Sequence, residues 1–227
     1  MGGQACVLYG AAEFSRDTDL AILATDENLD RLREALDHLQ AECIAVPPFE
    51  RVYLEMGLAV HFRCHHPDAD RMRVDIMTKM RGVDEFSQLW NRRTTIDLGN
   101  EIMDVLSLPD LVQSKKTQRD KDWPMITRLV EANYFAHRDK PNDQQVEFWL
   151  RELRTPALLV EAAAAYPERC RELVAVRDLL ALAGAGDHDA LQAALEREEQ
   201  QERERDRQYW QPLRAELQRL RRLRRSP

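Results

Sequence analysis

The hydrophobic and polar positions of the first forty residues predict a strand followed by a helix. Residues 4–9 form a short apolar stretch after Gly2-Gly3, and residues 19–23 (DLAIL) have the pattern of a strand entering a buried sheet. In residues 26–40, leucines at positions 29, 32, 36 and 39 follow helical spacing, and acidic residues fill the first turn. This order is typical of a strand with a crossover helix.

Three β-rich segments come next, and we expect them to extend the same sheet. They are residues 52–54, 59–63 (AVHFR) and 72–77 (MRVDIM), with a polar loop that contains Pro67 between the last two. Residues 83–102 then place apolar side chains on one helical face before the turn-like sequence Leu98-Gly99-Asn100. The first half of the chain therefore has the pattern of a mixed sheet with flanking helices.

The second half of the chain has the pattern of helices. Residues 109–135, 142–165, 167–183 and 187–225 all have helical periodicity, and no convincing strand follows Leu108. The sequence predicts an α/β (α+β) core over residues 1–108, a helical lobe over residues 109–190 and a long charged helix over residues 191–227.

Composition narrows the class of protein. A chain of 227 residues that is 44% hydrophobic can bury one core and a smaller second lobe. The longest apolar stretch, residues 156–166, is far shorter than the roughly 20 residues of a membrane span, and no leader pattern opens the chain. We expect a soluble, cytoplasmic protein. The net charge of −7 gives no global attraction to nucleic acid, so only local basic clusters could bind it.

The four cysteines, Cys6, Cys43, Cys64 and Cys170, have no paired CxxC spacing, which favours reduced and mostly buried thiols. The sequence Cys64-His65-His66, close to Asp68 and Asp70, has the alternative interpretation of a metal site. Its ligands lack a tetrahedral spacing pattern and fall in an expected hairpin loop.

The candidate chemistry lies at the start of the chain. The pair Gly2-Gly3 is followed, after thirteen residues, by Asp17-Thr18-Asp19 and an apolar strand. Alternate residues of a strand point to the same face, so both carboxylates can converge on one cation, and their hard oxygens suit magnesium. Small residues at the turn would let the backbone approach phosphate oxygens. The alternative is a polar turn that merely precedes a strand.

Two further features support a catalytic interpretation. Asp75 lies between apolar residues in an expected central strand, where an unpaired charge is costly to bury and a metal would remove that cost. Lys115, Arg119 and Asp122 are spaced four and three apart, as on one face of a helix, and two cations there could neutralise a triphosphate. The alternatives are an edge strand with Asp75 in water and an ordinary solvated helix face.

Together these residues resemble the nucleotidyltransferase superfamily, and within it the AbiEii-like toxins of bacterial toxin–antitoxin and abortive-infection systems. The resemblance covers residues 1 to about 130 and rests on Gly2-Gly3, Asp17-Thr18-Asp19, Val74-Asp75-Ile76, Asp110-Leu111-Val112 to Lys115, Arg119 and Lys121-Asp122. It implies a mixed sheet, two Mg²⁺ ions and transfer of a nucleoside monophosphate from an NTP to a hydroxyl, with release of pyrophosphate.

The resemblance also implies roles for individual residues. Asp17 and Asp19 would ligate metal, and Asp75 would share a metal and act as general base. Asp122 would orient Lys115 or the acceptor. The residues expected at the nucleotide are Gly2, Gly3, Ser15, Lys115, Arg119 and Asp122.

The start of the chain departs from the family pattern, because the glycine pair normally ends a strand and here only Met1 precedes it. The sequence therefore predicts either that natural residues precede Met1 or that the core lacks its first strand. The second case would leave an open sheet edge beside residues 19–23.

The C-terminal segment bears on which of three candidate functions the chain has. Residues 214–225 carry six arginines against one glutamate, with Leu213, Leu217 and Leu220 on one face. They predict either a solvated helix with one docked stripe or an arginine face that binds RNA phosphates. The first function is a toxin that acts on tRNA or another macromolecule and has a cognate antitoxin. The others are a small-molecule, aminoglycoside-type nucleotidyltransferase and a catalytically degenerate interaction protein.

Overall fold

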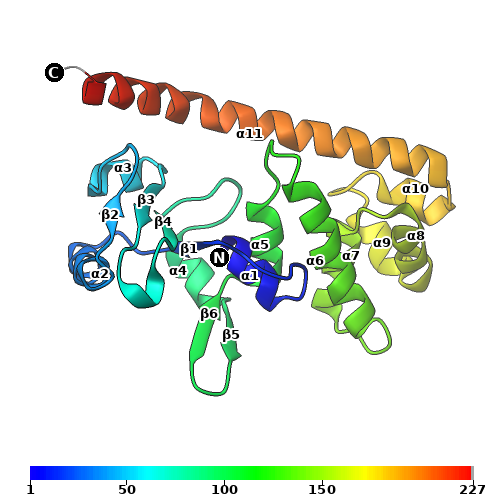
Figure 1. Cartoon of the computed structure of the whole chain (residues 1–227). Helices are drawn as coiled ribbons and strands as arrows, with labels where there is room; N and C mark the ends of the chain where they lie inside the picture. Colours follow the sequence, from blue (N-terminus) through cyan, green and yellow to red (C-terminus); the bar gives the residue numbers. More distant parts are fainter. Residues whose placement is uncertain (226–227) are drawn as a thin grey trace. The chain divides into compact units, whose positions relative to one another are not determined.

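A computed structural model describes residues 1–225, which form a mixed α/β part followed by helices (Figure 1). The elements of the first part are α1 (Gly2–Leu8), β1 (Asp17–Ala21), α2 (Asp26–His38), β2 (Glu42–Cys43), α3 (Arg51–Glu55), β3 (Val60–Arg63), η1 (Pro67–Ala69), β4 (Arg73–Met77), α4 (Phe86–Asn91), β5 (Thr94–Asp97) and β6 (Ile102–Val105). The helices that follow are α5 (Leu108–Ser114), α6 (Asp122–His137), α7 (Asp143–Glu152), α8 (Pro156–Ala165), α9 (Pro167–Leu173), α10 (Leu180–Ala185) and α11 (His188–Arg225).

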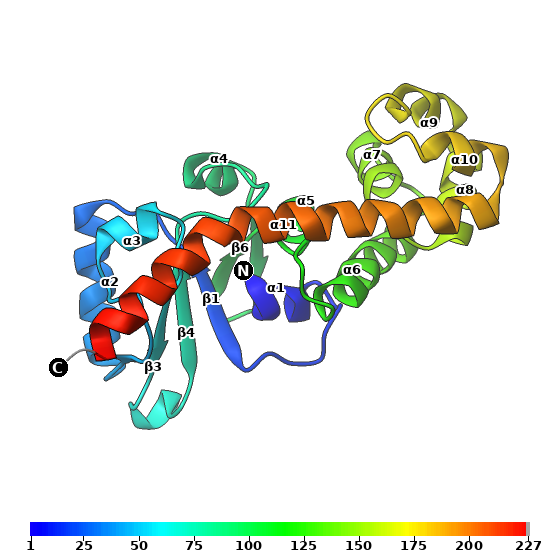
Figure 2. The same cartoon turned by 90° about the horizontal axis from the view of Figure 1, so that it is seen from above.

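The main sheet has four strands in the order β1-β4-β3-β2. Strand β1 pairs with β4 in parallel, and β3 pairs with β4 in the antiparallel sense (Figure 2). Strand β2 pairs with β3, also in the antiparallel sense. The register places Asp75 of β4 beside Asp19 of β1 on one side and beside His61 of β3 on the other. Among the described strands, β1 forms one edge of this sheet.

One face of the sheet carries the core of this part of the molecule. Val60, Phe62, Val74 and Ile76 are buried there together with leucines of α2 and α3. Helix α2 begins where the Thr25 side chain accepts a hydrogen bond from the Asn28 backbone N–H at 3.3 Å. Because side chains alternate across a strand, the neighbours of these apolar residues along β3 and β4 point to the opposite, polar face.

The described chain forms two compact units. The first contains residues 1–114 together with the part of α11 that begins at Arg207, and the second contains Lys115–Asp206. Helix α11 contributes residues to both units. The sequence places its boundaries after residues 108 and 190, and the last two residues of its third segment, 226–227, lie outside the described part.

Three segments differ from the sequence-based expectation. Residues 52–54 belong to α3 and not to a strand, with Leu54 fully buried and Val52 half exposed. Strands β5 and β6 form a hairpin around the predicted turn at Gly99, where only the turn is expected. Residues 115–121 are not helical, because α5 ends at Ser114 and α6 begins at Asp122.

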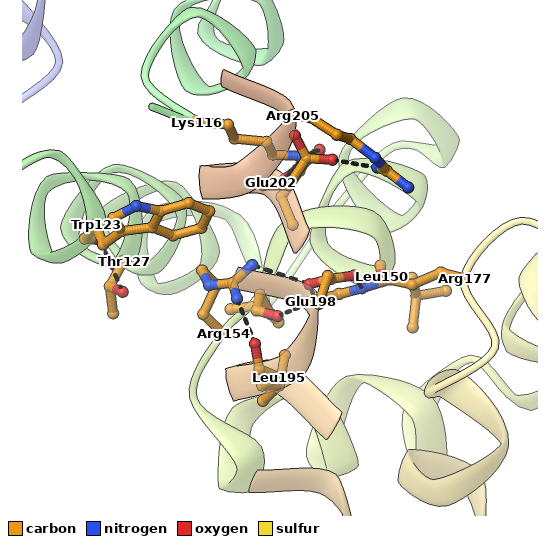
Figure 3. A network of polar contacts seen from close by, with 12 residues as sticks. Lys116, Trp123, Thr127, Leu150, Arg154, Arg177, Leu195, Glu198, Glu202 and Arg205 are labelled. Atoms are coloured by element: carbon orange, nitrogen blue, oxygen red, sulfur yellow. Dashed lines mark hydrogen bonds and ion pairs between the residues drawn. The ribbon is translucent and has the colours of Figure 1, made fainter. Parts of the chain in front are cut away.

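A buried network of charges holds the second unit together. Glu198 of α11 accepts hydrogen bonds from Arg177 at 2.9 Å and from Arg154 at 2.9 Å, and Figure 3 shows the two guanidinium groups reaching it from two sides. Arg177 also donates to the backbone oxygens of Leu150 and Leu153. These bonds tie this part of α11 to the chain around the end of α7.

Two further expectations concern the cysteines and membranes. All four cysteines are free, and Cys6, Cys64 and Cys170 are buried, as the sequence predicts. No helix within residues 1–225 combines the length and apolar character that crossing a membrane requires.

Candidate functional site

The polar face of the sheet gathers the predicted carboxylates. Asp17 and Asp19 lie two residues apart on β1, and their register partners on β4 are Arg73 and Asp75. Register partners and alternate residues share a face, so these four side chains form two adjacent rows on the polar side of the sheet. The structure therefore brings Asp19 and Asp75 onto neighbouring strands at the same level.

The two glycines pack closely against Asp19 and Ser15, where an added β-carbon would force a side chain to shift. Gly2 has a φ of +68°, and a Cβ built on it would lie 1.8 Å from Oδ2 of Asp19. A Cβ on Gly3 would lie 2.2 Å from Oγ of Ser15. The Gly3 N–H donates to Asp19 Oδ2 at 3.3 Å, and the Ser15 hydroxyl donates to the Asp17 carbonyl oxygen at 3.0 Å. The glycine pair thus lets the start of α1 position Asp19.

Asp75 is held by two neighbours on the same face. Its two carboxylate oxygens accept hydrogen bonds from Nε and Nη2 of Arg73 at 2.8 and 2.9 Å. Nδ1 of His61 lies 2.8 Å from Oδ1 of Asp75. The same Nδ1 also lies 3.1 Å from Nη2 of Arg73, so this ring nitrogen faces an acceptor on Asp75 and a donor on Arg73. The residue Asp75 is 7% exposed, so these bonds compensate a charge that is almost fully buried.

The ionisation of Asp75 follows from this setting. Burial alone would raise the pKa of its carboxyl, but the hydrogen bonds from His61 and Arg73 outweigh burial and hold that pKa below its ordinary value. The pKa of Arg73 is raised, first by its hydrogen bonds to Asp75 and also by the charges of Asp17 and Asp19. Arg73 therefore interacts electrostatically with all three carboxylates.

The donor chemistry of this face suits a hard divalent ion, because three carboxylates provide oxygen ligands and Arg73 stands among them as a cation. Within residues 1–225, however, no three His, Cys, Asp or Glu side chains converge closely enough to hold a metal together. Asp75 already contacts Arg73 and His61 through its carboxylate oxygens, which is a physical reason why these oxygens do not converge with those of other carboxylates. At the alternative site in the hairpin loop, His66 instead accepts a hydrogen bond from the backbone N–H of Asp68.

A pocket opens in the first unit where β1 and β4 end. It has a volume of about 920 Å³. Loop residues that follow the two strands line it, including Leu23 and Lys79, together with Arg51, Phe86 and Tyr209. Pockets of this size hold small organic ligands, and the carboxyl ends of parallel strands are common places for them.

The other predicted site residues belong to the second unit. Asp122 is 3% exposed, and its Oδ2 accepts hydrogen bonds from Nε of Arg119 at 2.7 Å and from the hydroxyl of Thr117 at 2.5 Å. Nζ of Lys115 lies 3.9 Å from its other oxygen. Lys115, Arg119 and Asp122 thus meet, but through the loop of residues 115–121 and not along a helix face. In this segment the backbone N–H of Arg119 donates to the Thr117 hydroxyl and the backbone N–H of Gln118 donates to Asp206, so side chains accept the hydrogen bonds that a helix would take up internally.

Arg73 and His61 are partners of Asp75 that the sequence pattern alone did not identify. A signal for Arg73 is present in the sequence, because it stands two positions before Asp75 in the same predicted strand and therefore shares its face. His61 lies in the middle of another predicted strand, but only the pairing of β3 with β4 shows that it faces Asp75.

A comparison with models of known protein families finds no match to this chain, and comparisons with curated proteins and with solved structures find none either.

Proposed function

We propose that the chain is a magnesium-dependent nucleotidyltransferase that moves a nucleoside monophosphate from an NTP to a hydroxyl acceptor. One observation carries the proposal: Asp19 and Asp75 lie side by side on parallel strands, and the glycine pair packs directly on Asp19. Gly2 leaves no room for a β-carbon at that contact. This close packing gives the Gly2-Gly3 pair a physical role, because a larger residue at position 2 would clash with Asp19.

In the proposed reaction, the acceptor oxygen forms a bond to the α-phosphorus of the NTP. The bond between that phosphorus and the oxygen bridging to the β-phosphate breaks, and pyrophosphate leaves with the electron pair. Asp75 takes the proton of the acceptor hydroxyl as general base. Magnesium held by Asp17, Asp19 and Asp75 would neutralise the charge of the triphosphate.

Other parts of the chain are assigned to substrates on chemical grounds. Within the first unit we assign Gly2, Gly3 and Ser15 to phosphate contacts. Within the second unit Lys115 and Arg119 are two cations on one buried carboxylate, and their charge suits them to an anionic substrate group. The acceptor is a macromolecule such as tRNA, because arginines 219, 221, 222 and 224 of α11 are exposed beside the buried Leu213 and Leu220. A toxin with a cognate antitoxin is the biological setting that we infer.

The position of the radioactive label can test the reaction. The protein is incubated with Mg²⁺, total RNA or protein, and each NTP labelled in turn at the α- or the γ-phosphate. We predict that α-label is incorporated into an acceptor and γ-label is not, because the γ-phosphate leaves with pyrophosphate. Asp17→Asn and Asp19→Asn should each reduce incorporation by at least about 10²-fold, since each removes a ligand charge.

The matched control is Asp30→Asn, which changes an exposed aspartate of α2 that pairs with Arg33 at the surface. It should transfer at the wild-type rate. Incorporation of γ-label would indicate phosphoryl transfer and contradict the proposal. The absence of incorporation from any NTP, with wild-type protein shown to be folded, would favour the degenerate interaction protein.

A further inference from the structure

A pocket in the second unit has a buried arginine in its wall. The pocket has a volume of about 350 Å³, which suits a small organic molecule. The side chain of Arg154 is only 7% exposed and lines this pocket beside the apolar residues Trp123, Pro124 and Leu195. Cζ of Arg154 lies 4.7 Å from the centre of the Trp123 ring. The pocket therefore combines a buried cation with an apolar surface.

The charges of the buried network around Arg154 do not balance. Among the described residues, Arg154 and Arg177 pair with a single carboxylate, that of Glu198. Both arginine side chains are buried, and guanidinium groups stay charged in proteins. Burial lowers the pKa of Arg154, the charge of Glu198 opposes this shift, and the charge of Arg177 adds to it. One positive charge of this triad is thus left without a carboxylate of its own.

Arg154 also has donors that the protein leaves unused. Nη1 of Arg154 donates to Glu198, and Nη2 donates to the backbone oxygen of Leu195 at 2.8 Å. Nε of Arg154 makes no hydrogen bond to any residue from 1 to 225, and it is not sealed from solvent. Figure 3 shows Arg154 between Glu198 on one side and Trp123, a wall of the pocket, on the other. A ligand in the pocket can therefore supply the missing acceptor.

We propose that this pocket binds a small organic oxyanion, a phosphate ester or a carboxylate on a flat apolar body, with Arg154 as its anchor. The oxyanion accepts hydrogen bonds from the N–H groups of Arg154 that the protein leaves unused, and it compensates the surplus buried charge. The apolar body lies against Trp123 and Leu195. The pocket is much larger than an inorganic oxyanion, so we assign it to an organic one. The site lies wholly within the second unit and does not depend on the proposed transfer reaction.

Three carboxylates also line the pocket, and their exposure limits their effect. Asp120 and Glu199 both pair with Arg203, at 2.6 and 2.8 Å. The Asp120 side chain is 98% exposed, and Glu196 is exposed and accepts a hydrogen bond from a glutamine of its own helix. Water and salt screen exposed charges much more than buried ones. The buried Arg154 therefore decides the sign of the ligand.

Isothermal titration calorimetry at physiological salt can test the site with phenyl phosphate and benzoate as probes. These molecules carry the two candidate oxyanions on the same flat ring. We expect at least one of them to bind the wild type with a Kd below about 1 mM, and uncharged phenol to bind at least about tenfold more weakly. The tighter of the two probes identifies the oxyanion. Inorganic phosphate should bind more weakly than phenyl phosphate, because it lacks the apolar body.

Arg154→Met and Arg151→Met form a matched pair of variants. Both remove one positive charge from the same stretch of chain, but Arg151 does not line the pocket and its side chain is 41% exposed. Arg154→Met should weaken the tighter probe at least about tenfold, because the charge-assisted hydrogen bonds are lost. Arg151→Met should change its Kd by less than about threefold. We expect Arg154→Met to fold, because Arg177 keeps Glu198 as its partner.

If Arg154→Met does not fold, nuclear Overhauser contacts between the probe and the wild type decide. The ring protons of the probe should contact the indole protons of Trp123, and contacts confined to other residues would overturn the inference. A Kd above about 1 mM for both probes would also overturn it. So would equal binding of phenol or an unchanged Kd in folded Arg154→Met. The probes contain no nucleotide, so these outcomes are separable from those of the transfer assay.

Discussion

At the scale of single residues, the structure gives physical reasons for the glycine pair at the start of the chain and for Arg73 beside Asp75. Gly2 and Gly3 admit Asp19 and Ser15 at distances that exclude a β-carbon, and Arg73 compensates Asp75. The spacing of the glycines and aspartates along the chain also fits a polar turn before a strand, and the folded structure adds that the glycine pair packs against Asp19. The pairing of Arg73 with Asp75 depends on the folded sheet, because a carboxylate in an apolar run is compatible with a metal, an arginine or water as its partner.

The contact at Gly2 leads to a prediction with a built-in control. Gly2→Ala should lower the free energy of unfolding by about 1–3 kcal/mol more than Gly10→Ala, because its β-carbon has to displace Asp19. Gly10 also has a positive φ, +75°, but a β-carbon there meets nothing within 4 Å. Both variants therefore share the backbone strain, and only one adds the clash.

Denaturant unfolding of the two variants measures this difference, and the transfer assay should show a loss only in Gly2→Ala. Equal stability of the two variants would mean that α1 does not pack on Asp19 as described.

At the scale of elements, the sequence predicts long periodic segments better than short ones. The predicted helix over residues 26–40 agrees with α2, and β3 and β4 lie within their predicted segments. Strand β1 begins and ends two residues before the predicted segment 19–23. Residues 52–54 are too few for their apolar character to distinguish a strand from a helix. The helix leaves Val52 51% exposed beside a fully buried Leu54, whereas a strand would place both on one face.

The buried charges of the second unit give a prediction for α11. Glu198→Ala should lower the free energy of unfolding by about 3 kcal/mol, because it leaves Arg177 and Arg154 without their carboxylate partner. Those two side chains are only 5% and 7% exposed. Glu196→Ala, on the exposed face of the same helix, should change the free energy by less than about 0.5 kcal/mol. Denaturant unfolding compares the two, and similar values would show that the network contributes little.

The same carboxylate predicts a pH dependence. Burial would raise the pKa of Glu198, but the hydrogen bond and charge of Arg177 outweigh it and hold the pKa below its ordinary value. Its ionised form therefore contributes stability above the unfolded-state pKa of about 4.3, and this stability is lost as the pH falls through the lower folded-state pKa. The difference in unfolding temperature between the wild type and Glu198→Gln should stay constant above about pH 5 and shrink below about pH 4. A difference that does not change with pH would contradict this assignment.

At the scale of the whole molecule, the predicted site residues fall in two separate units. The glycine pair and the three aspartates all belong to the first unit, whereas Lys115, Arg119 and Asp122 belong to the second. The sequence predicts the division between a mixed α/β part and a helical part, because the hydrophobic period changes near residue 108. The sequence does not predict that α11 contributes residues to both units. The helical pattern is continuous, so it does not indicate where along the helix the packing partners change.

The proposed function depends above all on whether Asp17, Asp19 and Asp75 bind the metal together. The sharpest test is the anomalous scattering of Mn²⁺ in crystals grown with an NTP analogue that cannot be cleaved between its α- and β-phosphates. We predict Mn²⁺ bonded to oxygens of all three aspartates, with the analogue's phosphates beside it. Mn²⁺ and analogue bound elsewhere would contradict the proposed function.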